Sequence, residues 1–492
     1  MAETPMFRFD NSFAREMEGF YTPWQGEAVP DPQIVRLNGA LAEELGLDPA
    51  RLDTAEGAAA LAGAHSPAGA DPLAMVYAGH QFGGFSPQLG DGRALLVGEI
   101  VDVHGARRDL HLKGSGRTPY SRQGDGKAVL GPVLREYLFG EAMHALGIPT
   151  TRALAAVTTG ETIRRDGPQP GAVLARVAAS HLRVGTFQFF AARRETDKLR
   201  QLADYAIARH YPELAGQDDR HLALLRRVRD AQAALVARWM LVGFVHGVMN
   251  TDNVTISGET IDYGPCAFID NYDQRAVFSS IDDQGRYAYG NQPGIALWNM
   301  ARFAETLIPL VNPDDADAAI AVLSTELDGF GETYLRHWNA GMRAKLGLAA
   351  ELPGDAELAA DLLAAAAGQQ VDYTRLFRAL ADLVRGDATP ARALFTDPAG
   401  FDRWTGAYLA RLAQEGSDPA ERAAAMDAVN PLYIPRNHLV EEALAAARDG
   451  DLAPFDRLLA VLSAPFTAQD GAERYAHGAP EGSARHVTFC GT

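Results

Sequence analysis

Two polar residues near the middle of the chain have the types and the spacing to hold a metal ion. Asn253 lies at the end of a short polar loop, and Asp262 follows shortly after, in front of a Tyr-Gly pair. An amide and a carboxylate that converge can bind the Mg²⁺ ions that bridge the phosphates of a nucleotide. Residues 254–261 predict a short β-hairpin between them, because two runs rich in β-branched residues flank a Ser-Gly-Glu turn.

The same loop lacks one residue that phosphotransferases use. Protein kinases carry a catalytic aspartate five residues before such an asparagine, and that position is Val248 here. A valine can neither accept a proton nor bind a metal, which argues against an ordinary kinase mechanism. Asp252 remains as a candidate base beside Asn253. Taken alone, the loop also fits a capped turn between a helix and a strand.

A glycine-rich segment, residues 76–131, predicts the strands that would carry a phosphate ligand. Residues 94–101 and 109–113 have the composition of paired strands. Because side chains alternate along a strand, Lys113 projects from the face opposite Leu110, where an ammonium can meet a phosphate. The glycine clusters match neither the Rossmann nor the Walker pattern, so the segment alone is weak support for nucleotide binding.

A helix predicted at 133–146 carries a glutamate that can partner this lysine. Kinases pair a strand lysine with a helix glutamate to hold the ammonium against the phosphates, and Lys113 with Glu136 repeats that order. The alternative for Glu136 is a surface position on an amphipathic helix. Further along, Arg176 and Arg183, each considered alone, fit surface ion-pair partners.

The remaining elements are mostly helical. Residues 222–244 predict a long helix that leads into the polar loop, and the chain is alanine-rich and helical from residue 312 onward, at 315–346, 357–368, 373–384 and 437–448. Near the N-terminus, 32–45 has apolar residues at helical spacing, and 54–70 predicts an exposed helix and loop. Together with the strands, these patterns predict an α+β fold.

Charge and composition exclude several classes of partner. The chain has 45 Lys and Arg against 63 Asp and Glu, a net charge of −18, which argues against nucleic acid or an anionic membrane as the main partner. A phosphate site must therefore concentrate its basic residues locally. The N-terminus does not resemble a signal peptide, and the longest apolar run, 233–249, contains charge and is too short for a bilayer. These features predict a cytoplasmic protein.

The chain has two cysteines, Cys266 and Cys490, which excludes a disulfide framework and a four-cysteine zinc site. One lies just after Asp262 and the other close to the C-terminal end. Two inert thiols are one interpretation. A reversible bridge that ties the tail to the segment after Asp262 is the other, and in a reducing compartment such a bridge would be regulatory.

Several stretches of the sequence resemble one family. Residues 77–93, 109–135, 246–270 and 430–437, with the aromatic stretch 20–24 and the late cysteine, are similar to the selenoprotein O family of protein adenylyltransferases. The resemblance implies a kinase-like two-lobed fold that transfers AMP from ATP, bound in an inverted orientation, to Ser, Thr or Tyr hydroxyls of proteins, with release of pyrophosphate. The regions would be an N-terminal extension (1–75), a nucleotide-binding lobe (76–195), a catalytic lobe (196–310) and a helical region with the cysteine tail (311–492).

The resemblance also implies roles for individual residues. Asp252 would accept the proton, as a weak base if its pKa is about 4, and Asn253 with Asp262 would bind Mg²⁺, with Mn²⁺ as the alternative. The implied nucleotide site consists of Gly90, Gly92, Arg93, Lys113, Asp125, Gly126, Glu136, Arg176, Arg183 and Asp262. Cys490 stands where selenium-containing relatives have selenocysteine, and its bridge to Cys266 remains open.

Two other functions stay open at this point. A protein kinase or small-molecule kinase that transfers the γ-phosphate would share the loop and the Asp-x-Gly motif, but should have an aspartate at position 248. A pseudokinase scaffold without catalysis would tolerate loss of the metal ligands, which are present. The sequence does not indicate an oligomeric state.

Overall fold

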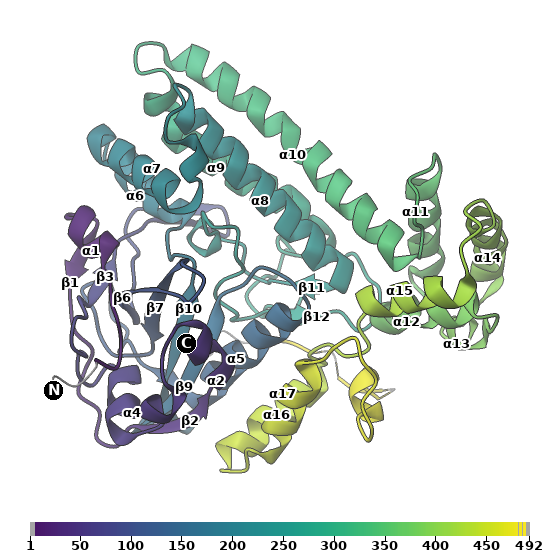
Figure 1. Cartoon of the computed structure of the whole chain (residues 1–492), viewed down its shortest axis with the longest axis horizontal. Coiled ribbons are helices and arrows are strands. Elements are labelled where there is room, and N and C mark those ends of the chain that lie inside the picture. The colour runs from purple at the N-terminus through teal and green to yellow at the C-terminus, as the bar shows by residue number, and fades with distance from the viewer. Residues whose placement is uncertain (1–4, 481, 485, 489–492) are drawn as a thin grey trace.

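The computed structural model describes residues 5–480, 482–484 and 486–488, which form an antiparallel β-sheet and a set of long helices (Figure 1). The strands are β1 (Tyr21–Pro23), β2 (Gln33–Leu37), β3 (Leu73–Met75), β4 (Gly79–Gln81), β5 (Gly84–Ser86), β6 (Ala94–Val101), β7 (Arg107–Lys113), β8 (Ala128–Val129), β9 (Arg152–Arg165), β10 (Gly167–Ala178), β11 (Phe244–Val245) and β12 (Ala267–Phe268).

The helices fall into three groups along the chain. The first group is α1 (Ser12–Glu16), α2 (Gly39–Glu44), α3 (Pro49–Leu52), α4 (Ala55–Leu61) and α5 (Leu130–Ala145). The second is α6 (Val184–Ala192), α7 (Thr196–His210), α8 (Arg220–Val242), α9 (Gln292–Val311) and α10 (Ala316–Lys345). The third is α11 (Asp355–Ala366), α12 (Tyr373–Val384), α13 (Thr389–Arg392), α14 (Ala399–Leu412), α15 (Pro419–Val429), α16 (Asn437–Arg448) and α17 (Ala453–Leu462). The predicted α+β class is thus confirmed.

The main sheet has eight strands in the order β1-β3-β6-β7-β10-β9-β2, with β8 paired to β10. The first 75 residues therefore contribute β1, β2 and β3 to the sheet that carries Lys113. The helical spacing at 32–45 was misleading for its first half, because residues 33–37 pair with β9 as β2. The helix begins only after Asn38, whose side chain accepts a hydrogen bond from the backbone N–H of Leu41.

The two faces of the sheet have different environments. Leu110 and Leu112 of β7 are buried with Leu41 and Leu61 of α2 and α4, so the helix predicted to be exposed near residue 55 instead covers this face. The alternation predicted for β7 is confirmed, because Lys113 points to the opposite face, where α5 packs. The sheet therefore separates an apolar layer from the layer that contains the polar site.

Three long helices connect the sheet region to the C-terminal helices. Helix α8, predicted from residue 222, packs against both α9 and α10, and it ends at Gly243 with a φ of 76° that favours glycine. Figure 1 shows these helices leading to α11–α15 at the end of the molecule farthest from the sheet, while α16 and α17 return to pack on α5. The predicted C-terminal helices are confirmed.

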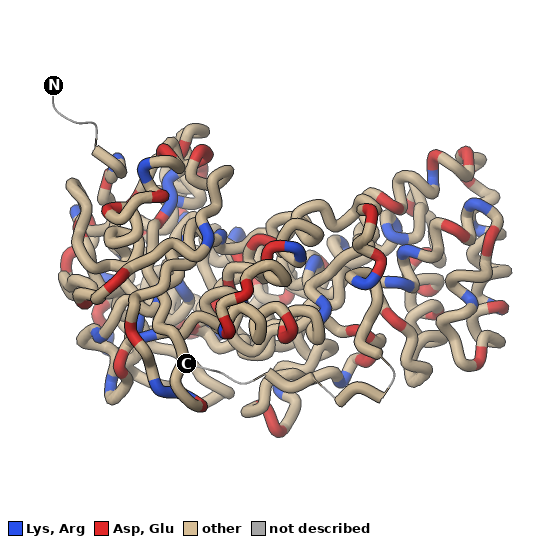
Figure 2. The backbone as a smooth tube through the Cα atoms, turned by 90° about the horizontal axis from the view of Figure 1, so that it is seen from below, with Lys and Arg blue, Asp and Glu red and all other residues tan. Residues whose placement is uncertain are grey.

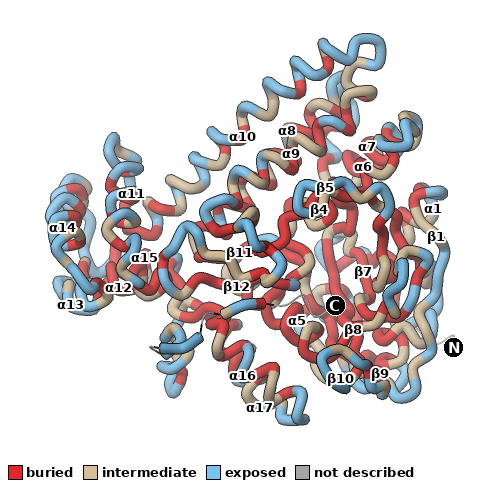
Figure 3. The backbone as a smooth tube through the Cα atoms, turned by 180° about the vertical axis from the view of Figure 1, so that it is seen from behind, coloured by how far each residue is buried: buried red, intermediate tan, exposed pale blue. Residues whose placement is uncertain are grey.

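Acidic and basic residues are mixed along the chain. Figure 2 shows Lys and Arg interspersed with Asp and Glu over most of the backbone. Figure 3 shows buried segments concentrated in the sheet and in the helix faces that pack against it. Among the residues the structure covers, no helix combines the length and the apolar character needed to cross a bilayer.

Candidate nucleotide-binding and catalytic site

A pocket of about 1260 Å³ opens between the sheet, α5 and the loop that follows α8. Its lining includes each residue predicted to bind nucleotide or metal and the predicted base: Gly90, Gly92, Arg93, Lys113, Asp125, Gly126, Glu136, Arg176, Arg183, Asp252, Asn253 and Asp262. Lys and Arg outnumber Asp and Glu in this lining, although the chain carries a net charge of −18. Basic residues are thus concentrated locally, as a phosphate site requires.

Three cations converge on the carboxylate of Asp262. Its Oδ1 accepts hydrogen bonds from Lys113 Nζ at 2.8 Å and Arg176 Nη1 at 2.7 Å, and its Oδ2 accepts one from Arg183 Nη1 at 2.7 Å. Burial opposes ionisation of Asp262, but the three neighbouring cations outweigh it and hold its pKa well below the usual value. The backbone of Asp262 is left-handed, with a φ of 62°, a strained conformation that places this carboxylate among the cations.

Glu136 of α5 completes this cluster from the other side. Its Oε2 accepts a hydrogen bond from Lys113 Nζ at 2.6 Å and its Oε1 one from Arg176 Nη1 at 3.0 Å. Glu136, Arg176 and Arg183 are all buried, so the surface positions considered for them are wrong. Within this hydrogen-bonded cluster three cations share two carboxylates, which favours an anionic ligand at this part of the pocket wall.

His111, which the sequence analysis did not single out, positions one of these arginines. Its Nδ1 accepts from Arg176 Nε at 3.3 Å, which leaves Nε2 to donate to Asp91 Oδ2 at 3.2 Å. Burial and the nearby arginines hold the pKa of His111 well below its usual value, so the ring is neutral. Strand alternation could have identified His111 from the sequence, because its side chain shares a face with that of Lys113.

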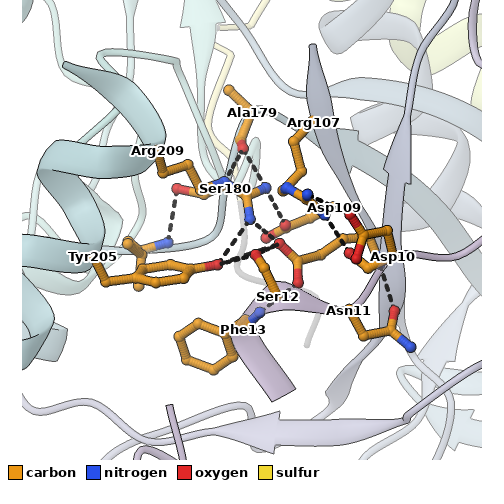
Figure 4. A network of polar contacts seen from close by, with 12 residues as sticks. Asp10, Asn11, Ser12, Phe13, Arg107, Asp109, Ala179, Ser180, Tyr205 and Arg209 are labelled. Atoms are coloured by element: carbon orange, nitrogen blue, oxygen red, sulfur yellow. Dashed lines mark hydrogen bonds and ion pairs between the residues drawn. The ribbon is translucent and has the colours of Figure 1, made fainter. Parts of the chain in front are cut away.

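A buried polar network continues from His111 to the N-terminal helix. His181 stacks on His111 with 4.0 Å between ring centroids and donates from Nδ1 to Asp109 Oδ2 at 3.0 Å. Arg209 of α7 bonds the other oxygen of Asp109 at 2.6 Å (Figure 4). Arg209 also pairs with Glu99. Glu99 in turn accepts bonds from the backbone and side chains of α1. Arg176 is thus linked to α1 through a chain of buried hydrogen bonds and one ring stack.

The loop before Asp262 is not the predicted hairpin. Residues 254–261 do not pair as two strands with each other; Thr255 bridges to Arg183 and Thr260 bridges to Thr150. The short β11–β12 ladder closes the base of the loop instead. The prediction failed because these β-prone residues pair with distant segments. The bridge at Thr255 fixes the backbone of Arg183 beside the loop that carries Asp252 and Asn253.

Asp252 lies on the 3₁₀ turn Thr251–Asn253 and is almost completely buried. Its Oδ2 accepts a hydrogen bond from Gln81 Nε2 at 3.2 Å, whereas its Oδ1 has no hydrogen-bond partner among the residues covered by the structure. Burial raises the pKa of Asp252 to about 6. The carboxylate is therefore a better base than the unperturbed aspartate assumed from sequence.

Asn253 and Asp262 suit the metal ion that the sequence predicts. The amide of Asn253 donates from Nδ2 to the backbone oxygen of Val248 at 3.0 Å, so its Oδ1 is the atom left to serve as a ligand. The described residues contain no group of three or more His, Cys, Asp or Glu that could hold a metal. This ligand set fits Mg²⁺, which binds through one or two protein groups together with water and substrate phosphates.

Two of the predicted glycines are required by the backbone. Gly90 has a φ of 118°, and a Cβ there would lie 2.6 Å from the ring of Tyr120. Gly126 has a φ of 72°, and a Cβ there would lie 2.1 Å from the backbone oxygen of Gly116. Asp125 beside it forms a bidentate pair with Arg165, with both N–O distances 2.9 Å. These residues shape the pocket wall.

Two further residues at the site escaped the sequence analysis. Gln81 bonds Asp252, and the ring of Tyr77 lies 4.7 Å from the guanidinium carbon of Arg183. Both belong to the glycine-rich segment 76–131, in which the sequence predicted roles for Gly90, Gly92 and Arg93 but not for these two residues. Their contacts depend on how this stretch folds against a loop far away in sequence.

Cys266 is buried, and burial raises the pKa of its thiol to about 12. Its backbone oxygen accepts a bond from Arg135 Nη2 at 2.6 Å. The predicted partner, Cys490, lies outside the described residues, so the bridge stays a prediction.

Known proteins are similar to this chain over almost its whole length. The family model described as "Protein adenylyltransferase SelO" matches residues 5–463. The chain is 63% identical to the Protein nucleotidyltransferase YdiU of Cereibacter sphaeroides strain KD131, over 99% of this chain and 100% of the relative. It is 58% identical to the protein of that name from Pseudarthrobacter chlorophenolicus, over 98% of this chain and 97% of the relative. The chain therefore belongs to the SelO family of protein adenylyltransferases.

Proposed function

We propose that this adenylyltransferase moves AMP from ATP to Ser, Thr or Tyr hydroxyls of protein substrates in a kinase-like fold, with ATP bound in an inverted orientation. The observation that carries the proposal is the chemical difference between the residues at positions 252 and 248. Asp252 has a buried carboxylate with a free oxygen, whereas Val248, at the position of a kinase base, has no proton-accepting group. A hydroxyl activated at Asp252 would meet a different phosphorus atom than it would in a kinase.

The cation cluster supports the proposed nucleotide orientation. Lys113, Arg176 and Arg183 bring more positive charge to one point than Glu136 and Asp262 neutralise. Such a point is suited to the β- and γ-phosphates, which carry most of the charge of ATP and leave together as pyrophosphate. Arginine forks bind phosphate oxygens in pairs, which adds orientation to the electrostatic attraction.

The reaction would then proceed by in-line displacement at the α-phosphorus. The substrate oxygen forms a bond to the α-phosphorus, the bond from that phosphorus to the bridging oxygen of pyrophosphate breaks, and the hydroxyl proton passes to Asp252 Oδ1. Lys113, Arg176 and Arg183 stabilise the charge that develops on the leaving pyrophosphate. Mg²⁺, when bound by Asn253 and Asp262, would neutralise phosphate charge. A pKa of about 6 keeps Asp252 ionised and ready to accept a proton at neutral pH.

Substitution of Asp252 by Asn tests this assignment. The variant keeps the shape and the bond from Gln81 but loses the proton acceptor, so we expect the rate of AMP transfer to fall by roughly 10²–10⁴-fold. ATP affinity, measured by calorimetry, should change little. A variant that transfers AMP at the wild-type rate would contradict the role of Asp252.

A further inference from the structure

A protein that receives AMP must bring its hydroxyl to Asp252, and one surface element lies directly against that carboxylate. This element is the hairpin β4–β5. Gln81 bonds the carboxylate of Asp252, and a Cβ added at Gly79 would lie 2.6 Å from its Oδ1. The hairpin is also tied to the loop by the backbone N–H of His80, which donates to Thr251 Oγ1 at 2.7 Å. Its position relative to the acceptor site is therefore fixed.

The outer side of this hairpin is aromatic and open to solvent. Phe82 and Phe85 are 37% and 42% exposed, and Figure 3 shows the turn between β4 and β5 as an exposed segment. Phe82 has a φ of 50°, an unfavourable conformation for a residue with a side chain. Phe82 and the half-exposed Ile281 also line the pocket, so the apolar surface is continuous with the proposed active site.

A neighbouring arginine adds charge to this surface. The guanidinium of Arg286 lies 4.8 Å from the ring centre of Trp298, and its carbon is 3.7 Å from where a Cβ of Gly83 would be. Trp298 in turn packs against His80 on the hairpin. Within the described chain Arg286 forms no ion pair with a carboxylate, whereas the nearby Arg302 pairs with Glu305 at 2.6 Å. In a protein of net charge −18, an arginine held on an aromatic ring without an acidic partner is suited to an acidic group from outside.

We propose that hairpin β4–β5, with Trp298 and Arg286, docks the segment of the protein substrate that surrounds the target hydroxyl. The preferred segment is extended, with a large apolar side chain near the hydroxyl and an acidic side chain beyond it. This inference rests on the proposed function, because the hydroxyl must reach Asp252. Its support is the continuity of the surface with the pocket and the charge of Arg286.

The register of the hairpin predicts the spacing. Phe85 is paired with His80, next to Gln81, which contacts Asp252. Cross-strand partners share a face and successive residues alternate, so the side chain of Phe85 lies with His80 on the face opposite Gln81. One strand spacing of about 4.8 Å plus one residue of about 3.3 Å separates the backbones of Phe85 and Gln81, and a bound peptide must also pass around the edge of the hairpin. An extended peptide needs three or four residues for this path, so the apolar side chain should lie three or four positions from the hydroxyl.

Synthetic peptides with a single Thr test the proposal directly. Phe is moved through each position from four before to four after the Thr in an otherwise Ala-rich and Ser-free background, with either Asp or Lys placed one residue farther out. Transfer from ATP labelled at the α-phosphate is measured for each peptide. We expect kcat/KM to be roughly tenfold higher with Phe three or four positions away than with Ala there, and higher with Asp than with Lys.

Three variants identify the surface responsible. Phe85→Ala should remove the preference for Phe and raise the KM for the best peptide several-fold, with the KM for ATP unchanged. Arg286→Glu should reverse the preference between Asp and Lys. Leu335→Ala removes a side chain that is 52% exposed on α10, away from the hairpin, and should alter neither preference.

The results distinguish an error in the proposed docking surface from an error in the proposed function. Equal transfer to all peptides, or unchanged preferences in Phe85→Ala and Arg286→Glu, would overturn the docking surface and leave AMP transfer intact. A wild-type protein that binds ATP but transfers label to none of the peptides nor to any protein of a lysate would refute the proposed function, and the docking surface with it.

Discussion

Replacement of Asp262 by Asn should slow AMP transfer without weakening the binding of metal-free ATP. The carboxylate accepts bonds from Lys113, Arg176 and Arg183, and Glu136 also bonds Lys113 and Arg176. The Asn side chain has nearly the same shape but no charge. It therefore removes the proposed metal ligand and increases the positive charge that faces the phosphates by one unit.

The two effects have opposite signs in two assays. We expect Asp262→Asn to lose about 4 kcal/mol of transition-state stabilisation with the proposed metal ligand, which corresponds to about a thousandfold slower AMP transfer. Metal-free ATP, in contrast, should bind at least as tightly to the variant, because two unit charges a few ångströms apart near a surface interact by a few kcal/mol before screening by salt. Without ATP, the buried Arg176 and Arg183 and the partly buried Lys113 would lose a shared carboxylate, which should destabilise the fold by roughly 3–5 kcal/mol.

The measurements are α-label transfer with Mg²⁺, calorimetry with ATP and EDTA, and thermal unfolding with and without ATP. We expect ATP to raise the melting temperature more in Asp262→Asn than in the wild type. The control is Glu326→Gln, which removes a carboxylate paired with Arg226 at 2.6 Å on the helices. A variant that keeps more than about a tenth of the rate, or that loses metal-free ATP binding, would refute this account of the cluster.

Two further predictions concern stability. Lys345 is fully buried, and burial lowers the pKa of its ammonium to about 7, whereas the unfolded chain has about 10.4. Between these values only the unfolded chain holds the proton, so stability should rise with pH by up to about 1.4 kcal/mol per unit. The ring of Phe377, 4.1 Å away, favours the charged form and therefore narrows this pH range from its lower end. Lys345→Met should raise the free energy of unfolding below pH 7 and flatten its rise up to pH 10, and equal slopes for both proteins in urea titrations would contradict this. Arg209→Met leaves Glu99 and Asp109 without their shared cation and should cost roughly 3–5 kcal/mol in the free energy of unfolding, measured in the same way; a loss below about 1 kcal/mol would show that this network is not a structural support.

Local patterns in the sequence predicted part of the site. Alternation along β7 placed Lys113 on the polar face, and helical periodicity placed Glu136 on α5, because both patterns depend on neighbours within one element. The pairing of Lys113 with Glu136 was predicted because kinases have the same order of a strand lysine followed by a helix glutamate. The helices from residue 316 onward were equally predictable, since their apolar spacing is regular.

Contacts between distant segments account for what could not be predicted. β-prone residues at 254–261 suggested a hairpin, but Thr255 pairs with Arg183 instead. Gln81 reaches Asp252 only because a hairpin remote in sequence folds onto the loop that carries Asp252. Burial of Asp252, which raises its pKa, is likewise a property of the assembled fold that local sequence does not contain.

The most direct test of AMP transfer follows the α-phosphate and the γ-phosphate of ATP separately. Purified protein is incubated with Mg²⁺, a cell lysate and ATP labelled at either the α- or the γ-phosphate, with Asp262→Asn as the control. We expect label to enter protein from the α-position alone and to be lost in the variant. Label from the γ-position alone would make the protein a kinase despite Val248 and would contradict the proposed inversion of ATP.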